Sequence, residues 1–128
     1  MTPFQGIIIE ESLVDKSILK KLKILSTEVE KVTTEHATPW IKNWTMHTVE
    51  ILESDVEDVI NKISSALDST RCNWYADIKN EKYHYIIFKE KVFKVNRLRP
   101  DGYQKVVKYG MNLGIPLHQL DFSPDIKK

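Results

Sequence analysis

The sequence is poor in the residues that cross-link or interrupt a small fold. It has one cysteine, Cys72, with four glycines and five prolines among 128 residues. A lone cysteine excludes an internal disulfide, and no repeat or Gly-, Ser- or Pro-rich stretch marks a linker. We therefore expect one domain over residues 1–122, followed by a flexible C-terminal tail over residues 123–128.

Long apolar runs are missing as well. The longest cover residues 6–9 and 85–88, far below the roughly 20 residues that span a bilayer. The first residues lack the basic segment and the apolar stretch of a secretory signal. We expect no membrane partner and a cytoplasmic location, with which a single cysteine is compatible.

An excess of charge of one sign is the third absence. Nineteen Lys and Arg against eighteen Asp and Glu give a formal charge of +1, so the whole molecule has no field that attracts nucleic acid. Basic residues gather over residues 82–108, where Arg97 and Arg99 are candidate anion-binding groups. Acidic residues gather over residues 50–58, so the charge pattern could orient self-association or attract an anion.

The patterns that are present predict alternating strands and helices. Short β-branched or aromatic runs predict strands over residues 6–10, 25–32, 44–51, 73–79, 83–88 and 92–95. Helical spacing predicts a two-turn helix after Asp15, a second after a capping box at Ser54 and Glu57, and a third from Asp101 to Gly114.

This order predicts the fold class. Strand, helix, strand, strand, helix, strand is the α+β arrangement of a ferredoxin-like βαββαβ core, here with an added C-terminal β-hairpin and a third helix. The charged segment at residues 25–32 is expected at a sheet edge, paired with the strand that follows it. The alternative is an α+β roll in which the aromatic hairpins form a separate small sheet.

Aromatic and histidine side chains form the main candidate for a ligand site. Residues 34–43 are predicted to form a surface loop, and loops often carry binding groups. Pockets with aromatic walls and a few polar groups hold small ligands. The indoles of Trp40 and Trp44 could instead pack over the sheet or against a partner chain. The candidate ligand-binding residues are His36, Trp40, Trp44, His47, Tyr75 and Tyr85.

Recognised motifs for catalysis or metal binding are absent. The four histidines have no neighbour at zinc-ligand spacing, and there is no P-loop, dinucleotide fingerprint or H-E-x-x-H string. We therefore predict no metal and no cofactor. An acid or base role would fall to His47, or to Glu10, Glu11 or Asp77 if the fold buries them near His47.

Three segments resemble a family of short uncharacterised prokaryotic proteins. They are residues 6–13, the hairpin over residues 85–93 and the ending over residues 109–122. The resemblance covers nearly the whole chain, but it implies no activity and no site residue. The family has no assigned function, and the matching segments are mostly core strands and helix ends.

Composition and pattern favour a non-catalytic module that binds a small ligand or another protein. Self-association as a homo-oligomer is expected through a sheet edge or the aromatic surface. The alternative is a small enzyme with a pocket lined by Trp, Tyr and His, in which His47 is the acid or base. A further alternative is single-stranded nucleic-acid binding, by base stacking on the aromatic rings with Arg97 and Arg99 at the phosphates.

Overall fold

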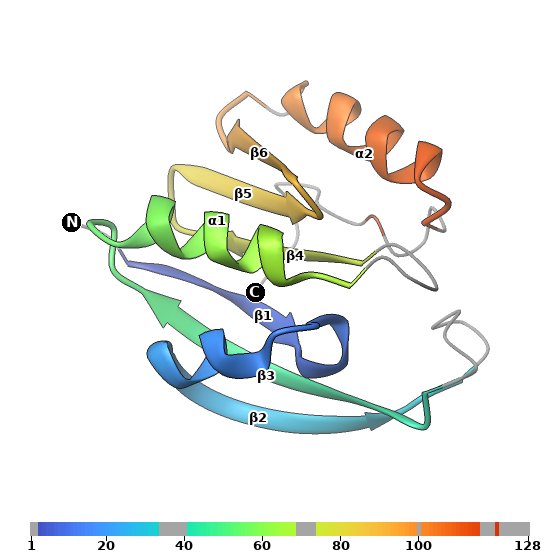
Figure 1. Ribbon diagram of the computed structural model, residues 1–128. Helices are drawn as coiled ribbons and strands as arrows, with labels where there is room; N and C mark the ends of the chain where they lie inside the picture. The colour runs from blue at the N-terminus through green and yellow to red at the C-terminus, as the bar shows by residue number, and fades with distance from the viewer. Residues whose placement is uncertain (1–2, 34–40, 69–73, 100, 116–119, 121–128) are drawn as a thin grey trace.

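A six-stranded antiparallel sheet with helices on both faces forms the fold (Figure 1). The computed structural model describes residues 3–33, 41–68, 74–99, 101–115 and 120. The strands are β1 Phe4–Ile9, β2 Lys23–Lys31, β3 Asn43–Ile51, β4 Tyr75–Lys79, β5 Tyr83–Phe88 and β6 Lys91–Asn96. The helices are α1 Val56–Ala66 and α2 Gly102–Asn112, with 3-10 helices η1 Glu10–Ser12 and η2 Lys16–Lys21. The predicted α+β class is confirmed.

The strands follow the spatial order β2-β3-β1-β4-β5-β6. The first strand therefore lies inside the sheet, where its β-branched run is covered by neighbours on both sides. β2 is an edge strand and pairs with β3, as predicted. The order of the whole sheet differs from the four-stranded order of a ferredoxin-like core, because β5 and β6 continue the same sheet beyond β4.

α1 and η2 cover one face of the sheet. The apolar stripe of α1 includes Val56, Ile60 and Ile63, all buried against the strands. The predicted capping box does not form: the helix begins at Val56, and Asp55 precedes it without a side-chain cap bond. For η2 the predicted cap is present, because the Asp15 carboxylate accepts the Ser17 N–H at 3.0 Å.

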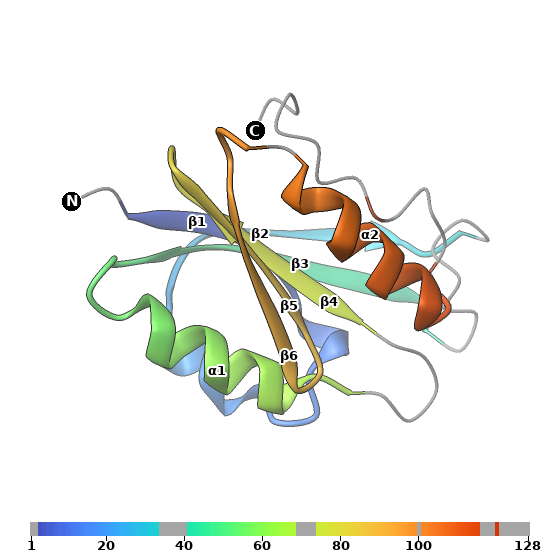
Figure 2. The same ribbon diagram turned by 90° about the horizontal axis from the view of Figure 1, so that it is seen from above.

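α2 packs on the opposite face, as Figure 2 shows. Its buried residues Tyr103 and Val106 join the cluster of β5 and β6 side chains on that face. Gly110 lets Leu120 approach, since a Cβ there would lie 2.6 Å from a Leu120 methyl carbon. The helix ends before Gly114, whose φ of +90° confirms the predicted glycine stop.

α2 covers only part of its face. Register places Ile7 of β1 opposite both Thr48 of β3 and Asp77 of β4, so these three side chains share the face on which α2 packs. Ile7 nevertheless stays 44% exposed, and Thr48 and Asp77 are half-buried. We call this region, defined by Ile7, Thr48 and Asp77, the open face.

Gly6 explains how closely β4 approaches β1. A Cβ built on Gly6 would lie 2.0 Å from the Asp77 carbonyl oxygen, a separation that no side chain can occupy. The absence of a side chain at Gly6 therefore allows β4 to pass close to β1 at Asp77. Within the described ranges, no helix is both long enough and apolar enough to cross a membrane. The predicted tail over residues 123–128 lies outside those ranges.

Candidate functional site

The predicted aromatic site is only partly within the described structure. His36 and Trp40 lie outside the described residues. Trp44, near the start of β3, is half-buried and packs on Trp74, with ring centroids 5.3 Å apart and planes inclined at 58°. The indole of Trp44 is therefore already in contact with the protein.

The two predicted tyrosines lie on opposite faces of the sheet. Tyr85 is buried in the layer of α1 and packs on Phe4, with ring centroids 5.3 Å apart. Tyr75 lies against the layer of α2 and packs on Phe88, at 5.9 Å. One pocket cannot be lined by both rings, because the sheet separates them.

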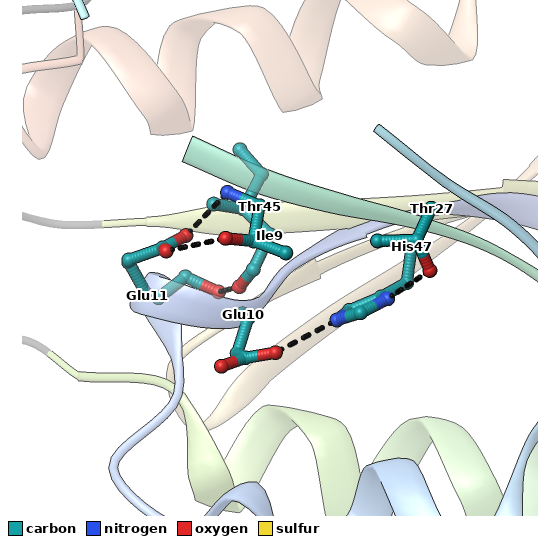
Figure 3. Close-up of polar contacts among 7 residues, drawn as sticks. Ile9, Glu10, Glu11, Thr27, Thr45 and His47 are labelled. Atoms are coloured by element: carbon teal, nitrogen blue, oxygen red, sulfur yellow. Dashed lines mark hydrogen bonds and ion pairs between the residues drawn. The ribbon is translucent and has the colours of Figure 1, made fainter. Parts of the chain in front are cut away.

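His47 is held between two side chains (Figure 3). Its Nε2 lies 2.9 Å from Oε1 of Glu10 in η1, and its Nδ1 lies 2.9 Å from the hydroxyl of Thr27 in β2. The residue is 8% exposed. Both ring nitrogens are engaged, so His47 joins η1 and the edge strand to β3.

Glu11 fastens the same turn to the same strand. Its two carboxylate oxygens accept the backbone N–H of Thr45 at 2.6 Å and the Thr45 hydroxyl at 2.8 Å (Figure 3). Carboxylates at strand ends are usually solvated, but here η1 carries both glutamates over β3. We call His47, Glu10, Glu11, Thr27 and Thr45 the η1 clamp.

A second histidine–carboxylate pair among the described residues lies on the face of the sheet that α2 covers. His84 of β5 is 2% exposed. Its Nε2 lies 2.7 Å from Oδ2 of Asp77, and its Nδ1 lies 2.8 Å from the hydroxyl of Tyr103 in α2. Asp77, a candidate acid or base if it were buried near His47, pairs with His84 on the other face instead.

Tyr103 connects this pair to Arg97. Burial raises the pKa of the Tyr103 phenol, the positive charge of nearby Arg97 partly offsets this rise, and the negative charge of Asp77 increases it. Tyr103 therefore keeps its proton at neutral pH. The Tyr103 hydroxyl also shares a hydrogen bond with Nδ1 of His84, so Tyr103 lies between Arg97 and the histidine.

The remaining step completes the series. Nε2 of His84 shares the next hydrogen bond with the Asp77 carboxylate. We call the series Arg97, Tyr103, His84 and Asp77 the polar chain. It leads from the Arg97 guanidinium to the Asp77 carboxylate through Tyr103 and His84.

Both ends of the polar chain line one pocket of about 580 Å³. The Arg97 guanidinium is fixed there by a 2.6 Å hydrogen bond from its Nη1 to the carbonyl of Asn80. The Asp77 side chain is 36% exposed. We call this cavity the sheet pocket; its described lining is Pro3, Gln5, Gly6, Ile7, Thr48, Asp77, Lys79, Asn80 and Arg97.

A smaller cavity of about 410 Å³ lies between η2 and α1. Its lining includes Asp58 and Lys62, which pair with each other at 3.0 Å. It also includes Asp15, whose pKa is lowered by hydrogen bonds from the Ser17 side chain and backbone. These charges are already compensated within the protein, and the η1 clamp lines neither cavity.

The sequence analysis named Arg97 and Asp77 separately but did not join them. The β4–β5 register could have placed His84 near Asp77, because a turn at residues 80–82 pairs Lys79 with His84 and puts Asp77 on the same face. Tyr103 carried no such signal, since its helix reaches β5 only through tertiary packing. Arg99, the second predicted anion-binding residue, is exposed and is not in the described lining of the sheet pocket.

Neither family models nor curated proteins nor solved structures give a match to this chain. The resemblance to short prokaryotic proteins stays a prediction. In the part of the chain that the structure describes, no three His, Cys, Asp or Glu side chains gather as metal ligands would. The candidate site therefore rests on the geometry of the polar chain and the sheet pocket.

Proposed function

We propose that this protein binds a small polar molecule in the sheet pocket. The observation that carries the proposal is the presence of Asp77 and Arg97 in the lining of one cavity of about 580 Å³. Ligand pockets commonly enclose roughly 300–1,000 Å³ and combine apolar surface with a few oriented polar groups. Ile7 supplies exposed apolar surface in the same lining.

Preorganisation supports this function. The polar chain holds Asp77 through His84, and the Asn80 carbonyl holds Arg97. Charged groups that are fixed before binding lose little conformational freedom when a ligand arrives. Asp77 and His84 lie on strands of the central sheet, which position side chains more accurately than loops.

Acid–base catalysis by His47 is the second candidate. The 2.9 Å contact between His47 and Glu10 favours it, because a carboxylate can orient an imidazole and stabilise its charged form. The same contact has a structural use in the η1 clamp, however. We rank catalysis below ligand binding because the clamp residues are absent from the described lining of the sheet pocket.

Self-association remains a separate proposal. All nine residues of β2 are exposed, and the strand lies at the edge of the sheet. An unpaired edge can accept a strand from a second copy. The charged residues of β2 oppose this pairing. The proposed ligand site does not require self-association.

We also propose that β1 to β4 form a ferredoxin-like core. Within these four strands, β3 lies between β1 and β2, and β1 lies between β3 and β4. α1 provides the connection from β3 to β4 and packs on the sheet. In this proposal β5, β6 and α2 are an extension that builds one side of the sheet pocket.

Native mass spectrometry tests the proposed function. The protein is incubated with a library of small polar fragments, and each bound mass is recorded. Thr48→Trp places an indole in the sheet pocket and should abolish binding. The matched control, Glu28→Trp, adds the same ring on exposed β2 and should bind the same fragments as the wild type. Equal binding by both variants, or no bound fragment on the wild type, would contradict the proposal.

A further inference from the structure

We infer that the ligand of the sheet pocket is a small zwitterion, with an ammonium group that pairs with Asp77 and a carboxylate that pairs with Arg97. The inference rests on the proposed function and specifies the class of ligand. It depends on the two charged ends of the polar chain and on the apolar surface in the same lining, which are considered in turn.

Asp77 offers an acceptor. One oxygen of its carboxylate receives the hydrogen bond from His84, and among the described residues the other oxygen has no partner. An ionised carboxylate has about four acceptor positions. A ligand ammonium group would supply the missing donors, and a charge-assisted hydrogen bond of this kind is stronger than a neutral one.

Arg97 offers donors. Its guanidinium gives one hydrogen bond to the Asn80 carbonyl. A guanidinium has five N–H groups and binds carboxylates in a bidentate manner. Lys79 adds a second positive charge to the same lining. An anionic group of the ligand therefore has a defined place.

The two ends together select against ligands of one sign. A simple anion would bring its charge near the Asp77 carboxylate, and a simple cation would bring its charge near Arg97 and Lys79. A zwitterion places each charge beside its opposite. Ile7, which is 44% exposed, adds apolar surface to the same lining, and the carbon chain of the ligand can contact it.

The test uses linear ω-amino carboxylates of increasing chain length. Each is compared with the straight-chain carboxylate and the straight-chain amine of the same carbon number, and dissociation constants are measured by NMR titration at neutral pH. At least one zwitterion should bind about tenfold more tightly than either of its halves, because it makes one additional charge-assisted interaction.

Two variants test which group of the ligand pairs with Asp77 and which pairs with Arg97. Asp77→Asn should reduce zwitterion affinity to that of the carboxylate probe, and Arg97→Gln should reduce it to that of the amine probe. The controls Asp58→Asn and Arg99→Gln make the same chemical changes outside the sheet pocket and should leave affinity unchanged.

Two results would overturn the inference and leave the proposed function intact. In the first, a carboxylate probe binds as tightly as its zwitterion, and Asp77→Asn strengthens that binding, which would define a simple anion site. In the second, no zwitterion binds, while other fragments still bind the wild type and fail to bind Thr48→Trp. The proposed function fails only if Thr48→Trp has no effect or if no fragment binds at all.

Discussion

Two histidines on opposite faces of the sheet make the same kind of contact with different consequences. His47 and His84 each have Nε2 within 3 Å of a carboxylate and Nδ1 within 3 Å of a hydroxyl. The carboxylates are also alike, since the side chains of Glu10 and Asp77 are each 36% exposed. The pairs themselves therefore do not reveal their roles.

The surroundings separate the two pairs. In the η1 clamp the hydroxyl belongs to Thr27 on an exposed edge strand, and the carboxylate holds a 3-10 turn. In the polar chain the hydroxyl belongs to buried Tyr103, and the carboxylate lines a cavity with Arg97. One histidine–carboxylate pair connects a turn to the sheet, and the other lies beside the cavity that we propose as a binding site.

Replacement of His84 should have the largest effect on stability. His84→Ala leaves the buried Tyr103 hydroxyl and the inner oxygen of Asp77 without their partner, which should cost about 3 kcal/mol of unfolding free energy. Urea denaturation measures the loss. The double variant with Tyr103→Phe removes one unpaired group and should recover part of it.

Replacement of His47 should have a smaller effect. His47→Ala should cost about 1 kcal/mol, because water can reach Glu10 and Thr27 once the ring is gone. Glu11→Gln is the matched probe of the same clamp and should cost no more than His47→Ala. A loss for His47→Ala that equals the loss for His84→Ala would contradict the distinction between the two pairs.

The smallest of these effects should be the change in unfolding free energy at alkaline pH. Folding raises the pKa of Tyr103 above its ordinary value of 10.0, so the folded state holds this proton more tightly than the unfolded state. The contribution to stability is complete below pH 10.0 and is lost as the pH rises through the higher pKa of the folded state.

Tyr103→Phe removes this dependence. The decrease in unfolding free energy between about pH 9 and about pH 11 should be smaller than in the wild type. Tyr109→Phe, in the same helix, controls for the loss of a phenol. A wild-type slope that Tyr103→Phe leaves unchanged would show that Tyr103 is not the responsible group.

Local patterns predicted the elements whose contacts are local. The β4–β5 turn formed as expected, because the Asn80 side chain accepts the N–H groups of Lys82 and Tyr83 at 2.9 and 2.8 Å. The stripe of α1 and the edge position of β2 also agree with the sequence. The capping box failed because Asp55, rather than Ser54, precedes the helix.

The candidate site depends on contacts that the sequence could not reveal. Arg97 follows β6, Asp77 lies on β4 and Tyr103 lies in α2, so their meeting depends on the docking of α2 on the face opposite α1. The close passage of β4 past Gly6 is equally non-local. The contacts of Glu10 and Glu11 with β3 are non-local in the same way.

The most direct test of the central claim is a protein-observed ¹H–¹⁵N NMR titration with the fragments that bind in native mass spectrometry. The account predicts that shift changes concentrate at the backbone amides of Gln5, Ile7, Thr48, Asp77 and Arg97, while His47 and Thr45 stay unchanged. Changes centred on the η1 clamp instead of the sheet pocket would contradict it.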